Sequence, residues 1–336
     1  MDVPEYDLPG ESIAQRPVEP RHAARLLVSL DPTDPVEHRH VFDLPGLLGE
    51  GDVLVINTTK VLPARLRLHK RSGGAAEVML LEPEGAGGVD SPCWTALVRP
   101  GRRLPPGTVL LADGQELVEV GEEVGEGTRR VRFLPDVPVS QLLESAGTVP
   151  LPPYIHQSLA EPGRYQTVYA DRLGSVAAPT AGLHLSHEVL AACTARGVVI
   201  AQVDLAVGLG TFRPLSATQV EEHVMHRERY QVPVTTMAAC RAARRVVAVG
   251  TTTVRALESA AATGNLAGDT RLYIHGAYRF QVVDVLLTNF HQPRSSLLVL
   301  LEAFCGPRWR ELYDTALAEG YRFLSFGDAM LVGRAT

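Results

Sequence analysis

The sequence predicts an α/β protein in which a large three-layer α/β domain is interrupted by a small, roughly six-stranded β-barrel. Strand and helix patterns alternate over residues 187–332, and two hydrophobic strands precede residue 60. Between residues 61 and 137, short strand-like segments and turns replace this alternation. The 336 residues suffice for one large or two ordinary domains. We therefore expect an α/β domain over residues 1–60 and 138–336 and an inserted barrel over residues 61–137.

Hydrophobic runs and helical periodicity define the expected elements of the α/β domain. Its strands are expected at residues 26–30, 53–57, 198–207, 246–249, 271–274, 282–290 and 329–332. Its helices are expected at residues 139–147, 187–196, 236–245, 254–262, 295–304 and 309–318. Alternation of this kind is typical of a sheet with helices on both faces.

The inserted region carries strand character without helical periodicity. Its six segments are residues 64–68, 76–81, 94–98, 109–111, 117–120 and 129–133. Turn clusters rich in Gly and Pro separate them, for example Arg71-Ser-Gly-Gly74 and Pro105-Pro-Gly107. A small barrel buries such strands without leaving open edges.

Composition narrows the function classes. The net charge of −6 lacks the basic excess of a dedicated nucleic-acid binder, although local basic clusters exist. The four cysteines form no CxxC pair, which argues against a zinc site or disulfide framework. His223 and His226 have a spacing that fits metal binding, but no third ligand is nearby, so we expect no metal. The acidic N-terminus and the lack of a long apolar run predict a cytoplasmic protein without membrane association.

The stretch from Gly174 to His184 consists almost wholly of small residues and ends in one titratable side chain. Small residues allow close approach of a ligand, and an imidazole serves general acid or base chemistry near neutral pH. A tight buried crossover with a hydrogen-bonded core His explains the same residues equally well. On the stretch alone, both interpretations stay open.

Two further segments place polar groups where buried strands end. Gly250-Thr-Thr-Thr253 opens a helix, whose N-terminus binds carboxylate or phosphate, although a Thr N-cap is the simpler reading. Thr288-Asn-Phe-His291 ends an apolar strand, where a ligand site and a satisfied core His are both plausible. A GxSxG motif is missing, so hydrolase chemistry finds little support.

Taken together, the segments resemble the S-adenosylmethionine:tRNA ribosyltransferase-isomerase family of queuosine biosynthesis. The resemblance covers nearly the whole chain in order. The matching runs are Tyr6-Asp-Leu-Pro, Ile13-Ala-Gln-Arg-Pro17, Gly51-Asp-Val-Leu-Val-Ile-Asn57, Val61-Leu-Pro-Ala-Arg65, Pro150-Leu-Pro-Pro-Tyr154, Tyr165-Gln-Thr-Val-Tyr169, Val176-Ala-Ala-Pro-Thr-Ala-Gly-Leu-His184, Val207-Gly-Leu-Gly-Thr-Phe212, His223-Val-Met-His226, Val249-Gly-Thr-Thr-Thr-Val-Arg-Ala-Leu-Glu-Ser259, Thr288-Asn-Phe-His291 and Phe326-Gly-Asp-Ala-Met330.

The resemblance implies a large α/β domain interrupted by a small β-barrel, and it implies a reaction. The family transfers the ribosyl part of S-adenosylmethionine to 7-aminomethyl-7-deazaguanine at the wobble position of tRNA. Adenine and methionine leave, and epoxyqueuosine is formed. S-adenosylmethionine is then a substrate rather than a recycled cofactor, and no other cofactor is implied.

This chemistry needs a base beside the sulfonium, a donor for departing adenine and a partner for the methionine carboxylate. We expect His184, followed by His226 or His291, to transfer protons. Gly250–Thr253 and Arg255 suit the carboxylate, and Tyr154 or Phe290 suits the sulfonium. The substrate-binding residues that the family motifs imply are Asn57, Lys60, Arg65, Tyr154, Pro179, Thr180, Ala181, Gly182, Gly208, Gly210, Thr211, Thr251, Thr252, Arg255, Glu258 and Asn289.

Several positions depart from the family pattern inside its motifs, including Thr58, Ile274 and Gln292, and three others bear on substrate identity. Lys60 replaces an Arg, which removes bidentate anion recognition, Ala206 replaces a His and His275 replaces a Pro. Two alternatives therefore accompany the tRNA reaction. One is a paralogue that uses S-adenosylmethionine with a small nucleoside or amine acceptor. The other is a non-catalytic protein that binds S-adenosylmethionine or RNA.

Overall fold

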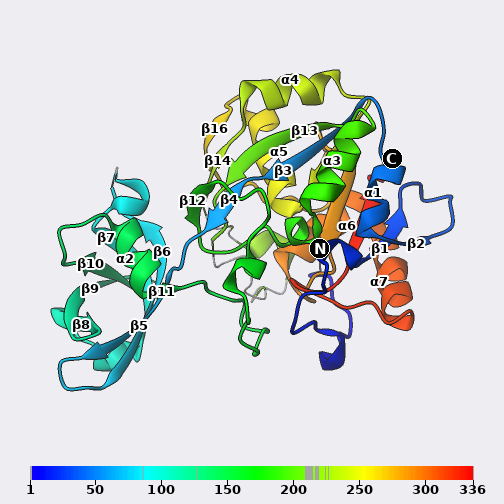
Figure 1. The fold of residues 1–336 in the computed structure, drawn as a ribbon. Coiled ribbons are helices and arrows are strands. Elements are labelled where there is room, and N and C mark those ends of the chain that lie inside the picture. The colour runs from blue at the N-terminus through cyan, green and yellow to red at the C-terminus, as the bar shows by residue number, and fades with distance from the viewer. Residues whose placement is uncertain are drawn as a thin grey trace. The chain divides into compact units, whose positions relative to one another are not determined.

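The computed structural model describes residues 2–85, 87–125, 127–208, 215, 219–223, 225 and 227–335. The chain divides into two compact units, which are treated separately below (Figure 1). The first comprises Met1–Thr59, Pro152–Arg172 and Ala178–Thr336, and the second comprises Lys60–Leu151 and Leu173–Ala177. In the described part of the chain, no helix has the length and apolar character needed to cross a membrane.

The first unit is built on a mixed sheet, to which the described residues contribute nine strands. In spatial order these are β16 (Ala267–Thr270), β14 (Glu228–Gln231), β13 (Val199–Leu205), β3 (Asp52–Asn57), β15 (Arg245–Val249), β17 (Val285–Asn289), β18 (Ala329–Gly333), β1 (Arg25–Ser29) and β2 (Glu37–His40). Neighbours from β13 to β17 run parallel, whereas β18 is antiparallel to β17. The central strands are buried on both faces, which explains their continuous hydrophobic runs.

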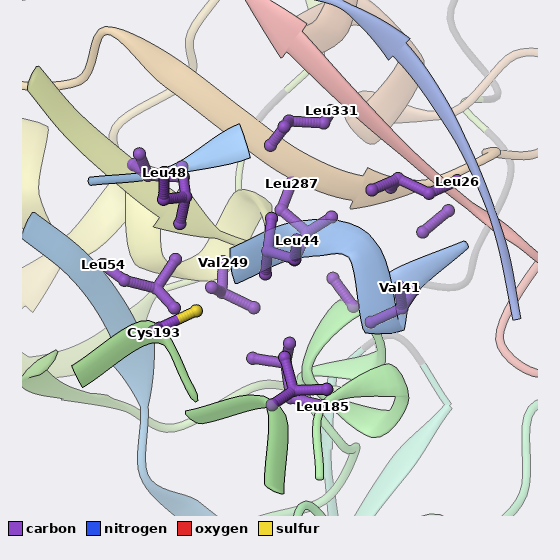
Figure 2. Close-up of a cluster of buried hydrophobic side chains, with 14 of the residues drawn as sticks. Leu26, Val41, Leu44, Leu48, Leu54, Leu185, Cys193, Val249, Leu287 and Leu331 are labelled. Carbon is purple, nitrogen blue, oxygen red and sulfur yellow. The ribbon is translucent and has the colours of Figure 1, made fainter. Parts of the chain in front are cut away.

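Helices cover both faces of this sheet. The α-helices of the first unit are α1 (Leu44–Leu47), α3 (His187–Ala195), α4 (Val234–Ala242), α5 (Thr251–Thr263), α6 (Ser296–Cys305) and α7 (Trp309–Ala318). Side chains of α1 and α3 share one core cluster with Leu54, Val249 and Leu287 of the sheet (Figure 2). Helices α4, α5 and α6 pack on the strands from the opposite side. The predicted α/β class is confirmed.

Two elements differ from their predicted bounds for local reasons. Helix α5 begins at Thr251 rather than residue 254, because Gly250 adopts φ 86° and Thr253 Oγ1 donates to Val249 O at 2.7 Å. The strand predicted at residues 271–274 is absent. The described chain leaves the sheet after Thr270, whose Oγ1 accepts the Leu272 amide at 3.0 Å. The sheet's edge strand lies just before this segment, in the polar β16.

The second unit contains the barrel. Its strands among the described residues are β5 (Arg65–Lys70), β6 (Ala75–Pro83), β7 (Cys93–Arg99), β10 (Thr128–Phe133), β9 (Gln115–Gly125) and β8 (Thr108–Ala112), in spatial order. Pairing of β5 with β8 closes the barrel. Buried and more exposed residues alternate along β5 and β7, and Trp94 is buried with its Nε1 donating to Ser91 O at 2.8 Å. The prediction of a six-stranded barrel is confirmed.

The second unit also contains segments outside residues 61–137. Helix α2 (Val139–Ala146) is anchored by the Ser140 amide, which donates to Asp90 Oδ1 at 2.9 Å. The short β11 (Gly147–Thr148) then pairs with β5. Most of β4 (Thr59–Val61) and of β12 (Arg172–Ser175) also belongs to this unit, and the two strands form a separate two-stranded sheet. The unit boundaries differ from those expected because these contacts connect residues remote in sequence.

Candidate functional site

Sheet topology gathers polar residues at one edge of the first unit. Because β13, β3, β15 and β17 run parallel, their carboxyl ends lie at the same edge. Asn57 ends β3, Gly250 follows β15 and Asn289 ends β17. The turn η7 (Thr180–His184) contacts β17. The topology therefore brings four of the segments singled out in the sequence to one edge.

Asn57 links two of these strand ends to the start of α5. Its Nδ2 donates to Leu205 O at 3.1 Å and to Thr252 Oγ1 at 3.2 Å. Its Oδ1 accepts the amide of Leu205 at 3.1 Å. Asn57 is buried and its amide is engaged on both sides. It therefore fixes the position of Thr252 and the α5 N-terminus.

The small residues of the Pro179–His184 turn are required by close packing. Ala181, Gly182 and His184 are buried, and the Gly182 amide donates to Pro179 O at 2.9 Å. A Cβ on Gly182 would lie 2.1 Å from Tyr169 Oη and 2.9 Å from Thr167 Cγ2. No side chain other than hydrogen fits there without displacing these neighbours.

Asn289 connects this turn to the sheet edge. Its Oδ1 accepts from Thr180 Oγ1 at 3.0 Å. Its Nδ2 lies 3.2 Å from Leu324 O and 2.8 Å from His184 Nε2. A carbonyl can only accept, so the Leu324 contact fixes the orientation of the amide. His184 Nε2 is consequently the acceptor and Nδ1 carries the proton.

Burial keeps the His184 imidazole neutral. The side chain is 4 % exposed, and burial lowers its pKa to about 3, assisted by the positive charges of Arg322, Arg164 and Arg21. The ring also borders a pocket lined by Arg21, Arg164 and Ser325. In the free protein, His184 is therefore a neutral donor through Nδ1, with its Nε2 lone pair engaged.

His291 is held more firmly than His184. Its Nε2 lies 3.0 Å from Thr288 Oγ1, and its backbone binds the hydroxyls of Tyr313 at 2.8 Å and Tyr6 at 2.6 Å. Burial lowers the pKa of His291 to about 3. Together with Asn289, Thr180 and Tyr154, it lines a second pocket.

Tyr154 is positioned by two side chains. Its hydroxyl lies 2.6 Å from Ser325 Oγ, and its backbone carbonyl accepts from Gln15 Nε2 at 2.9 Å. Burial raises the pKa of Tyr154 above its ordinary value, so the hydroxyl stays protonated. Phe290, the other aromatic residue proposed for the sulfonium, also borders the second pocket.

Arg255 lies one turn into α5 and is 6 % exposed. Its Nη1 forms a buried ion pair with Glu228, and its Nε donates to Leu272 O at 3.1 Å. Glu228 Oε1 accepts the Gly208 amide at 3.3 Å. Arg255, Thr251 and Thr252 line a third pocket, so these three predicted residues lie together. Sequence reasoning missed Glu228, because no local motif marks a pairing between residues 27 positions apart.

Other predicted residues lie elsewhere. The buried Glu258 carboxylate accepts the amides of Gln281, Val282 and Val283 at 2.8–3.1 Å, so it anchors a loop. Lys60 and Arg65 belong to the second unit. Three predicted residues, Gly210, Thr211 and His226, fall outside the described residues. Among the residues that are described, no three His, Cys, Asp or Glu side chains gather as metal ligands would.

Comparison with known proteins finds relatives that match nearly the whole chain. The family described as "Queuosine biosynthesis protein" matches residues 2–332. The S-adenosylmethionine:tRNA ribosyltransferase-isomerase of Rubrobacter xylanophilus is 51% identical over 98% of this chain and 97% of its own length. The protein of that name from Moorella thermoacetica is 48% identical over 98% of each chain.

A solved structure shares the fold. The crystal structure of an S-adenosylmethionine tRNA ribosyltransferase from Thermotoga maritima has a TM-score of 0.55 and 37% sequence identity. It covers 98% of this chain and 99% of its own. The chain therefore belongs to the queuosine biosynthesis protein family, whose curated relatives are named S-adenosylmethionine:tRNA ribosyltransferase-isomerases.

Proposed function

We propose that this protein is an S-adenosylmethionine:tRNA ribosyltransferase-isomerase. It transfers and isomerises the ribosyl part of S-adenosylmethionine onto 7-aminomethyl-7-deazaguanine at the wobble position of tRNA, giving epoxyqueuosine, adenine and methionine. Full-length similarity to relatives of that name carries the proposal. The buried Thr180–His184 turn, held against the end of β17, is the structural observation that supports it.

We assign His184 to hydrogen-bond donation at the departing adenine. Its Nδ1–H is the available donor, because Asn289 engages Nε2. A neutral imidazole can donate a hydrogen bond to a group that develops negative charge without itself being charged. Asn289 and Thr180 are positioning residues for this ring. His291 and His226 remain the candidates for the base that takes the proton beside the sulfonium.

S-adenosylmethionine is consumed as a substrate in this proposal, and no recycled cofactor or metal takes part. The sulfonium itself supplies the electrophilic activation, because its positive charge acidifies the neighbouring C–H bond. Tyr154 and Phe290 border the pocket that His291 also lines, and their rings suit a sulfonium cation.

The test incubates the protein with labelled S-adenosylmethionine and tRNA that carries the aminomethyl-deazaguanine. We expect adenine and methionine to be released only when that tRNA is present. The same tRNA with unmodified guanine is the matched control. Turnover without tRNA, or with a free aminomethyl nucleoside alone, would assign the protein to a small acceptor. Tight binding without release of adenine would contradict an enzymatic function.

A further inference from the structure

Two residues that line the pocket at the start of α5 carry buried polar atoms without partners in the part of the chain that the structure describes. Among the described residues, neither Nη2 of Arg255 nor Oη of Tyr273 has a hydrogen-bond partner. Both residues line the pocket that also contains Thr251 and Thr252. A buried donor without a partner costs free energy, so such atoms are normally paired with protein, water or ligand. Two of them in one pocket mark a site for an acceptor.

The chemistry of these donors points to an anion. Burial lowers the pKa of Arg255 to about 10, so its guanidinium stays charged at neutral pH. Burial raises the pKa of Tyr273 to about 12, so its hydroxyl stays a donor. The first turn of the 13-residue α5 adds free amides and a partial positive charge. The two unpartnered donors and the helix N-terminus therefore all favour a negatively charged acceptor.

The rest of the pocket selects among anions. Leu272, Ile274, Leu297, Leu300 and Met225 supply apolar walls. The Glu228 carboxylate pairs with Nη1 of Arg255, which neutralises part of its charge and orients the guanidinium. A doubly charged phosphate is disfavoured beside Glu228. A singly charged carboxylate on an apolar chain fits both the donors and the walls.

We propose that this pocket binds the carboxylate of the methionyl part of S-adenosylmethionine through Arg255 Nη2, Tyr273 Oη and the N-terminus of α5. The proposal rests on the proposed function for the identity of the ligand. The proposal adds Tyr273, which no sequence motif singled out. In the bound state, the apolar walls of the pocket contact the methylene groups of the methionyl chain. Asn57 is then a positioning residue, because it holds Thr252 Oγ1 at 3.2 Å.

The test compares S-adenosylmethionine with its decarboxylated analogue by isothermal titration calorimetry. We expect the protein to bind S-adenosylmethionine at least about tenfold more tightly, because the analogue leaves charged and hydroxyl donors unpaired. Tyr273→Phe weakens binding of S-adenosylmethionine about tenfold and leaves that of the analogue unchanged. Arg255→Lys, which retains a charge beside Glu228 but lacks Nη2, has the same selective effect. Tyr278→Phe is the matched control and leaves the preference unchanged.

Several outcomes overturn the proposal. Equal affinity for the two ligands, equal weakening of both by Tyr273→Phe, or binding of neither ligand would each do so. The protein could prefer S-adenosylmethionine over its decarboxylated analogue and still release no adenine with the modified tRNA. That result would contradict the proposed function and would leave the carboxylate site supported. If the protein releases adenine but binds the two ligands equally well, the carboxylate site is contradicted and the proposed function is supported.

Discussion

The side-chain amide of Asn289 donates a hydrogen bond of 2.8 Å to Nε2 of His184, which is 105 positions earlier in the sequence. Leu324 O fixes the orientation of that amide at 3.2 Å. This contact determines which imidazole nitrogen carries the proton and leaves Nδ1–H as the donor. The tautomer of the neutral His184 ring is therefore set by a residue on another element of the fold.

Replacing Asn289 with Asp should reverse this arrangement. A carboxylate beside Nε2 favours the protonated ring, so the pKa of His184 should rise by about 1–3 units. Titration of histidine by NMR in isotope-labelled protein measures the shift. Thr180→Val, which removes the other partner of the amide without adding charge, is the control. An unchanged His184 titration would show that the two residues do not interact in solution.

His184→Ala should reduce adenine release by about 10²-fold or more, the usual contribution of a preorganised hydrogen-bond donor to a group that develops negative charge. Folding should survive with a loss of about 1–3 kcal/mol, because a buried ring is removed and the Asn289 amide loses one of its partners. Adenine release is followed by chromatography and unfolding by circular dichroism. His187→Ala, an exposed residue at the start of α3, serves as the control. Near-native turnover of His184→Ala would refute the assignment.

Stability should depend on pH through the two buried histidines. In the folded protein, burial lowers the pKa of His184 and of His291 to about 3. The unfolded chain protonates them near 6.5, so below that pH it binds more protons than the folded chain. The stabilisation is complete above pH 6.5 and is lost as pH falls towards 3.

Urea unfolding between pH 7 and pH 5 measures this effect. For each histidine, the free energy of unfolding should fall by up to about 1.4 kcal/mol for each unit by which the pH is lowered below 6.5. His291→Gln should make the dependence shallower by about one such increment. A stability that does not change across this range would mean that both rings protonate freely in the folded protein.

Glu258 should matter for folding rather than for binding. Its carboxylate accepts three consecutive amides, from Gln281 to Val283, and the Tyr278 hydroxyl. Glu258→Ala leaves those amides without acceptors, so we expect a loss of at least about 3 kcal/mol in denaturant unfolding. Glu258→Gln retains one acceptor oxygen and should lose less. A fully stable Glu258→Ala with weak S-adenosylmethionine binding would instead place Glu258 in the substrate site.

Gly182→Ala should destabilise the turn before His184 by about 1–3 kcal/mol, because the new methyl group overlaps Tyr169 Oη. Tyr169→Phe removes that oxygen, which has no hydrogen-bond partner among the described residues, and should cost little alone. The double variant should recover part of the loss in thermal unfolding. Simple addition of the two effects would show that the hydroxyl is not the obstacle.

Local patterns predicted the elements whose burial is regular. The barrel strands β5 and β7 alternate buried and more exposed residues, and α7 lies at Trp309–Ala318 as expected. Strands β2 and β16 were missed because they are short and largely exposed, so their pairing depends on a neighbouring strand rather than on their own hydrophobicity. The bounds of the two units differ from the expected domain bounds for a similar reason, since α2 and β11 are held by long-range contacts.

The sequence predicted which segments form the candidate site, but it did not predict which atoms contact one another there. Motifs indicated His184, Asn289, Thr252 and Arg255, and topology brings these segments to one edge. Nothing in the local sequence indicates that Asn289 occupies a lone pair of His184 or that Glu228 pairs with Arg255. Such contacts join distant positions, so only the folded chain reveals which atoms remain available.

The position of β18 has a consequence for how the chain folds during synthesis. Leu26 of β1 pairs with Ala329 of β18, and β18 also separates β1 from β17. Strand β1 can pair with β2 early, but its other edge stays unpaired for roughly 300 residues of synthesis until β18 emerges. The six barrel strands lie within one stretch of sequence and can associate while the sheet is incomplete. The topology therefore sets an order of assembly, in which the inserted unit can fold before the domain that surrounds it.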